Sequence, residues 1–247
     1  MKKSVIAGTA GLLLFTAACG GGSKNPASVP STPTSTAKES PAAASHKDNG
    51  IAKKSAKQIL AAARQALAKA TSVHLSGART EKGDTIRIDM RIGRTGAKGT
   101  MTGPIKGALV PAQLLFVGKK SFMRGKRLWK ASGGNTMADL IGDRWVLMPK
   151  GQGGPTDLGN LKAMAASLKS VRAVSKGSKI TIGGQPAIGV KTKDSVFYVA
   201  MTDTPYLLRI SPLKGDKKKF ESLTDYNAPL TIAAPAKPLD LAKLGHH

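Results

Sequence analysis

A single cysteine, Cys19, is the feature that most limits how this 247-residue chain can fold. One cysteine can form no disulfide within the chain, so the folded part must be held together by its hydrophobic core. Cys19 follows two N-terminal lysines and an uncharged apolar run over residues 5–18. This run is shorter than the roughly 20 apolar residues that a membrane-spanning helix needs. We therefore interpret residues 1–18 as a cleaved signal peptide.

The residues around the cysteine carry a second indication. Small residues precede it and a glycine run follows, in Thr16-Ala17-Ala18-Cys19-Gly20-Gly21-Gly22. This pattern resembles the lipobox of bacterial lipoproteins, in which the cysteine sulfur receives diacylglycerol before cleavage, although Thr16 stands where Leu is usual. The resemblance implies a lipid anchor, such as palmitate, on Cys19 at the extracytoplasmic face of the plasma membrane. The alternative is an incidental cysteine in an ordinary secretory signal.

The segment after the cysteine has the composition of a tether. Residues 19–52 are mostly Gly, Ser, Thr, Pro and Ala, with few large aliphatic side chains. Such a segment cannot bury enough apolar surface to fold alone. We predict a lipidated, disordered tether over 19–52 and one folded domain over 53–247.

The charge of the chain limits its partners. With 39 basic and 14 acidic residues the net charge is +25, and the basic residues are scattered along the sequence. Such a field attracts anionic surfaces of any kind. Single-stranded nucleic acids are bound through aromatic side chains, which are few here. Because the chain is exported, we expect membrane lipids or anionic envelope polymers as partners and no nucleic acid.

Hydrophobic periodicity predicts an α+β domain. Helical spacing of apolar residues indicates helices over 55–70, 136–141 and 160–173. Alternating patterns with turn residues between them indicate an antiparallel meander and a second strand-rich region. The predicted strands are 73–77, 85–92, 97–102, 113–117, 121–124, 127–131, 144–148, 179–182, 187–192, 195–201, 206–211 and 220–223, with hairpin turns at 118–120 and 125–126.

The sequence offers little to catalysis. It has four histidines, three glutamates and no Gly-x-Ser-x-Gly, His-Glu-x-x-His, Walker or dinucleotide-binding motif. Ser211 and Lys214 have Ser-x-x-Lys spacing, but that motif works at the start of a helix, and here a proline follows the serine. We predict neither an enzyme, nor a metal site, nor a cofactor.

What remains is a large apolar face. The inward positions of the predicted sheet and helices either fill one another as a dry core or leave room for a ligand. The residues predicted to line such a cavity are Leu60, Leu67, Ile86, Ile88, Met90, Leu114, Phe116, Phe122, Met164, Leu168, Tyr198 and Leu208.

A succession of weak matches in the last third resembles a known family. These are Ile182-Gly183-Gly184-Gln185-Pro186-Ala187, Val196-Phe197-Tyr198-Val199-Ala200, Pro205-Tyr206-Leu207-Leu208-Arg209-Ile210 and Phe220-Glu221-Ser222-Leu223-Thr224-Asp225-Tyr226. Together with the lipobox, the tether and the opening helix they resemble the LppX/LprAFG family of actinobacterial lipoproteins. The resemblance implies a LolA/LolB-like antiparallel half-barrel wrapped over helices, with an apolar cavity for acyl chains.

Two hypotheses of function follow. The first is a lipid-anchored envelope lipoprotein that binds or carries an acylated lipid or lipoglycan in its cavity. The alternative is an envelope interaction protein whose basic surface docks on anionic headgroups or wall polymer, without a cavity.

Overall fold

The structure, a computed structural model, describes residues 47–244. The predicted signal peptide, the lipidation site Cys19 and the tether as far as residue 46 lie outside the described residues. The described residues belong to one compact unit, residues 45–247, with its own hydrophobic core. A chain of this unit alone therefore contains the interactions that a domain needs to fold.

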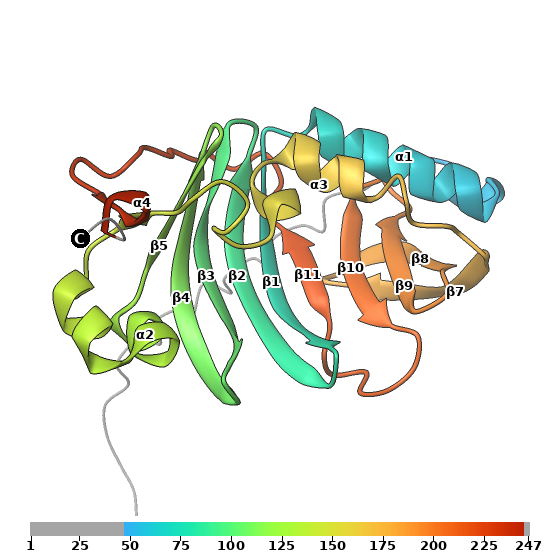
Figure 1. The fold of residues 1–247 in the computed structure, drawn as a ribbon. Coiled ribbons are helices and arrows are strands. Elements are labelled where there is room, and N and C mark those ends of the chain that lie inside the picture. Colours follow the sequence, from blue (N-terminus) through green and yellow to red (C-terminus); the bar gives the residue numbers. More distant parts are fainter. Residues whose placement is uncertain (1–46, 245–247) are drawn as a thin grey trace, which may run out of the picture. The chain divides into compact units, whose positions relative to one another are not determined.

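Twelve strands of the described part form one sheet in the order β12-β6-β5-β4-β3-β2-β1-β11-β10-β9-β8-β7 (Figure 1). All neighbours pair antiparallel except β12 and β6, which run parallel. The strands are β1 Ser72–Glu81, β2 Asp84–Gly93, β3 Gly96–Ile105, β4 Ala108–Val117, β5 Lys120–Arg124, β6 Val146–Leu147, β7 Ser175–Ile182, β8 Gln185–Lys191, β9 Ser195–Ala200, β10 Leu207–Pro212, β11 Glu221–Thr224 and β12 Leu239–Asp240.

The helices of the described part are α1 Ala56–Lys69, α2 Lys126–Ile141, α3 Leu161–Ser167 and α4 Leu241–Leu244, with short 3-10 turns at Ile51–Lys53 and Thr156–Leu158. Local sequence explains where α1 begins. The Ser55 side chain accepts from the Gln58 backbone N–H, and the Gln58 side chain accepts from the Ser55 N–H, which is a capping box. Its alanine-rich sequence then propagates the helix.

One face of the sheet carries the main core. Helices α1 and α3 lie side by side over this face (Figure 1), and α1 contacts β8, β9 and β10. We call it the core face and define it by Met90 and Leu114, both fully buried. Burying such side chains is the principal source of stability in a domain without disulfides. The predicted α+β class is therefore confirmed as one large, mostly antiparallel sheet with a few helices.

The segment 127–131 was predicted as a strand after a hairpin turn at 125–126, and this prediction is wrong. Helix α2 begins at Lys126, and the Trp129 N–H bonds to the Gly125 carbonyl. Adjacent Leu128 and Trp129 are both buried, as a helix allows and a strand with one buried face does not. The helix predicted at 136–141 is the second half of α2.

Two boundaries also differ from the sequence prediction. Residues 47–52, assigned above to the tether, pack on the domain: Ile51 is buried, and the Asn49 N–H bonds to the Met201 carbonyl. The helix predicted over 160–173 ends as α3 at Ser167, because Leu168 and the residues after it form tighter turns.

Candidate functional site

The core face is not filled everywhere. At the ends of β2 to β5 away from α1, a hollow of about 280 Å³ opens between the sheet and α2. Its apolar lining consists of Ile86, Met101, Pro104, Ile105, Val110, Ala112, Met123 and Leu128, and its glycine is Gly103. Charged residues Glu81, Lys82 and Asp84 border it.

Strand register explains why these side chains converge. Ile88, which is buried in the core, is the cross-strand partner of Met101, and Met101 is the partner of Ala112. Directly opposed residues of antiparallel strands point to the same face. Moving two residues along each strand keeps the face, which places Ile86, Gly103 and Val110 beside one another. The hollow therefore continues the apolar core face rather than forming a separate depression.

Helix α2 closes this hollow and is interrupted. Gly133 and Gly134 have non-helical backbone angles, and Gly134 has φ 76°, which a glycine adopts without strain. Leu128 comes from the half before this break, whereas Ala138 and Ile141 are buried from the half after it. Two methionines in the lining have unbranched, adaptable side chains. Both features allow the hollow to change its size.

An ion pair stands on the core face beside the hollow. Arg79 Nη1 lies 2.8 Å from Glu221 Oε1, and Arg79 Nη2 lies 3.2 Å from Glu81 Oε2. Burial of Arg79 disfavours its charge, but the hydrogen bonds and attraction of Glu221 and then Glu81 outweigh it and raise the pKa of Arg79. This ion pair, within the domain, joins β1 to β11 where the apolar face ends.

The predicted cavity-lining residues occupy several places. Eight belong to the main core: Leu60, Leu67, Ile88, Met90, Leu114, Phe116, Met164 and Leu168. Ile86 lines the hollow. Leu60 and Leu168 also border a small depression between α1 and α3. Most of these side chains therefore fill one another beneath the helices.

Three of the predicted residues, Phe122, Tyr198 and Leu208, do not share the core face. Phe122 pairs with Leu115, which pairs with exposed Lys98 on the opposite, outer face. Tyr198 and Leu208 pack into a second, small cluster with Ala187 and Ala200. The expectation of one apolar face fails here because the outer face has apolar patches of its own. A register shift in β10 between Leu207 and Arg209 adds to this.

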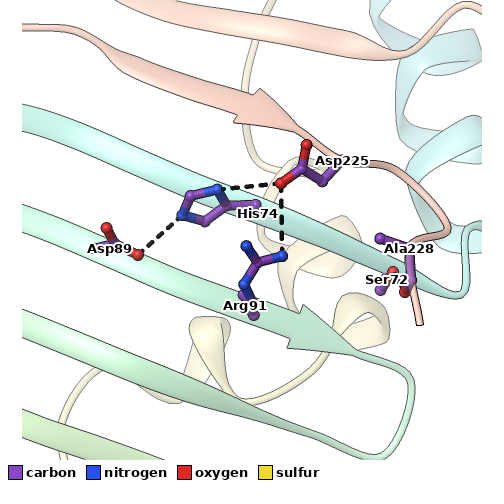
Figure 2. A network of polar contacts seen from close by, with 6 residues as sticks. All are labelled: Ser72, His74, Asp89, Arg91, Asp225 and Ala228. Carbon is purple, nitrogen blue, oxygen red and sulfur yellow. Dashed lines mark hydrogen bonds and ion pairs between the residues drawn. The ribbon is translucent and has the colours of Figure 1, made fainter. Parts of the chain in front are cut away.

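The outer face carries a larger groove of about 680 Å³, beside the C-terminal segment. Its lining combines charged and polar side chains of the sheet with Trp145 and three residues of that segment. Figure 2 shows the polar network at its edge: His74 Nε2 lies 2.9 Å from Asp89 Oδ1, and Asp225 Oδ2 is 3.6 Å from His74 Nδ1 and 3.5 Å from Arg91 Nη1. These contacts fasten the segment after β11 to β1 and β2. Each of the two depressions has three charged residues in its lining. The hollow suits an acyl chain better because its apolar side chains continue the core face, whereas the groove lies on the outer face.

Sequence reasoning missed most of the hollow. The prediction did not include five of the residues that line the hollow, namely Met101, Ile105, Val110, Met123 and Leu128. Met101 and Val110 lie in strands that mix apolar and polar residues without a regular alternation. No group of three or more His, Cys, Asp or Glu side chains that could hold a metal occurs in the described part of the chain. None of the helices within residues 47–244 is long and apolar enough to cross a membrane.

The fold and hollow define the chain as an α+β domain with an apolar depression on its sheet. Comparison with family models gives no match, and comparison with curated protein sequences gives none either. Solved structures with a similar fold include LprF from Mycobacterium bovis, with 15% identity and a TM-score of 0.49 over 74% of this chain and 97% of that one.

Two further solved structures are more distant. Lipoprotein LppX from Mycobacterium tuberculosis has 14% identity and a TM-score of 0.42 over 72% of this chain and 99% of that one. MucB in its complex with MucA from Pseudomonas aeruginosa has 16% identity and a TM-score of 0.31 over 74% and 59%. LprF and LppX bear names of the lipoprotein group that the sequence resembles. At these scores the likeness carries no argument about function, which rests on the chain's own residues.

Proposed function

We propose that this chain is a non-catalytic, lipid-binding lipoprotein of the cell envelope, anchored through Cys19, which takes an acyl chain of a lipid or lipoglycan into the hollow beneath α2. The observation that carries the proposal is the hollow itself, because its apolar lining continues the core face while its border is charged. In this proposal the sheet acts as a LolA/LolB-like half-barrel, and α2 is the movable part of its cover.

The proposed mechanism is physical. An acyl chain that leaves a membrane for an apolar hollow keeps its burial, which is worth about 0.8 kcal/mol per methylene. The hollow of about 280 Å³ lies just below the roughly 300–1,000 Å³ found for small-molecule sites. Longer chains therefore require α2 to move outward, with Gly133 and Gly134 as its hinge. A charged or sugar-bearing headgroup would stay at the border, near Lys82.

Filling the hollow tests the proposal. A Cβ at Gly103 would lie 3.3 Å from Ile86 Cδ1, the flexible end of that side chain. Gly103→Leu should therefore occupy the hollow with little strain on the backbone. The matched control is Thr102→Leu, because adjacent strand residues point to opposite faces. Uptake is measured on residues 45–247 by native mass spectrometry after incubation with lipid vesicles.

A tryptophan reporter gives a second measurement. Trp129 is buried next to Leu128 of the hollow, whereas Trp145 lines the outer groove. In a Trp145→Phe background, a brominated fatty acid should quench Trp129, and Gly103→Leu should remove most of the quenching while Thr102→Leu retains it. An empty wild-type domain in both measurements, or equal uptake by both variants, contradicts the proposal.

A further inference from the structure

A further depression lies in the helical layer. It is a groove of about 490 Å³ between α1 and α3, floored by small side chains such as Ala68 and Ala165. Its walls carry four basic residues and no acidic one: Arg64, Arg94, Lys162 and Lys169. A neighbouring depression of about 170 Å³ shares Arg64 and Lys169 and adds Lys57. The two depressions thus form one cationic groove.

The distribution of acidic residues in the sequence explains this groove. Between Asp48 and Glu81 the chain has no acidic residue, and between Asp157 and Asp194 it again has none. The first stretch contains α1 and the second contains α3, and the fold packs these two helices against each other. The protein's net charge of +25 is therefore not evenly spread, because two acid-free segments meet at this surface.

Spacing directs the basic side chains to the groove. Lys57 and Arg64 are seven residues apart on α1. Seven residues are nearly two helical turns, so Lys57 and Arg64 lie on one side of α1. Lys162 and Lys169 are also seven residues apart: Lys162 lies at the start of α3, and Lys169 lies two residues beyond its end. Lys162 and Lys169 both line the groove, the first from α3 and the second from the turn after it. Neither pair makes an ion pair with any residue of the described part.

Arg94 closes one end of the groove and is held in place. Its Nε donates to the Ala70 carbonyl at 3.1 Å, and its Nη2 donates to the Lys69 carbonyl at 2.7 Å. These bonds cap the C-terminus of α1 and fix the guanidinium beside the groove. Arg94 therefore places a positive charge, held by two backbone hydrogen bonds, in the lining of the groove, and guanidinium groups bind phosphate well.

We propose that this cationic groove binds the phosphate groups of anionic phospholipid headgroups and docks the domain on the membrane surface. The commitment to a membrane rests on the anchoring at Cys19 that the proposed function includes. From Cys19 to residue 47 there are 28 residues, which span at most about 100 Å when extended and so allow the groove to reach the bilayer. Tethering raises the effective concentration to about the millimolar range, so weak headgroup contacts suffice.

Vesicle binding by residues 45–247 tests the inference without the anchor. The probes are vesicles of phosphatidylcholine with three-tenths phosphatidylglycerol and vesicles of phosphatidylcholine alone, with co-sedimentation as the readout. Each basic residue near an anionic surface contributes about fivefold in affinity, so Arg64→Gln with Lys169→Gln should weaken binding to the mixed vesicles about 25-fold. Lys162→Glu, at an exposed position, is a second variant that leaves the core untouched.

The matched control removes two exposed basic residues of α2, which lies at the strand ends away from α1, by Arg127→Gln with Lys130→Gln. It changes the net charge equally and should weaken binding by no more than about threefold, since these charges lie away from the docked face. Any of three outcomes would overturn the inference. These are an equal loss of vesicle affinity in the groove and control variants, equal binding to both kinds of vesicle, or binding only to a soluble polyphosphate. Gly103→Leu should leave vesicle binding unchanged, so failure of the hollow and failure of the groove are separately visible.

Discussion

The ion pair of Arg79 with Glu221 gives a sharp prediction, because the same kind of pair occurs on both faces of the sheet. Glu221 is 10% exposed and Arg79 is 37% exposed on the core face. On the outer face, Arg91 pairs with Asp225 at 3.5 Å, and both side chains are about half exposed, at 47% and 48%. Arg→Met at either position removes the charge and keeps much of the apolar stem.

The expected cost differs between the two sites. Removing one partner of a fully buried pair costs about 3–5 kcal/mol, because the remaining charge is left unpaired. Water reaches Arg79, so we reduce this to about 2 kcal/mol for Arg79→Met. For an exposed pair the expected cost of Arg91→Met is at most about 1 kcal/mol. In a domain of this size, 2 kcal/mol corresponds to a fall in Tm of about 4–8 °C.

Thermal and urea unfolding of residues 45–247 measure this difference, with Glu221→Gln and the double variant completing a mutant cycle. We expect the double variant to be more stable than the sum of the single changes predicts, by about 1 kcal/mol, because it leaves no unpaired buried charge. The reasoning is refuted if Arg79→Met costs no more than Arg91→Met, or if the effects of the two single changes simply add.

Three further outcomes follow from local geometry. Gly77→Ala should cost about 3 kcal/mol or more in urea unfolding, because its φ is 134° and a Cβ would lie 2.0 Å from the Phe220 carbonyl oxygen. Ser55→Ala should lower the free energy of unfolding by about 1 kcal/mol, measured in the same way, because α1 loses its cap. Burial raises the pKa of Tyr226, so the stability that its neutral phenol gives is present below about pH 10 and lost as the pH rises further. Urea unfolding at pH 8 and 11 should show a decrease that Tyr226→Phe reduces.

The sequence predicted those parts of the fold in which local pattern and burial agree. The helix over 55–70 has both an alanine-rich composition and a capping box, and it appears as α1 with Ser55 as its N-cap. The strand over 85–92 alternates because only one of its faces is covered, and it appears within β2. The segment 127–131 was mistaken because five residues are too few to show a helical period in the sequence, and the burial of the adjacent Leu128 and Trp129 is seen only in the fold. Its helical state depends on packing over the end of β4, which the local sequence does not contain.

The hollow was harder to predict than the core for a related reason. A residue that packs and a residue that lines a cavity have the same apolar side chain, so hydrophobicity finds both and separates neither. What separates Ile86 from Ile88 is packing: Ile88 is buried in the main core, whereas Ile86, two residues away on the same face of β2, is only partly buried and lines the hollow. Phe122 and Tyr198 were assigned to the wrong face because residues on the outer face are also apolar. Only the register of the paired strands resolves such faces.

The hollow and the cationic groove lie at opposite ends of β2 and are independent sites. Arg94 of the groove directly follows β2, and Ile86 of the hollow lies eight residues earlier. At about 3.3 Å per residue of an extended strand this is about 26 Å, well beyond the roughly 7–10 Å within which substitutions couple. In the proposed arrangement the groove holds headgroups of the supporting membrane, and the lipid taken up beneath α2 is a separate molecule. On this basis the groove variants should slow delivery of lipid from vesicles but leave uptake of a soluble fatty acid unchanged.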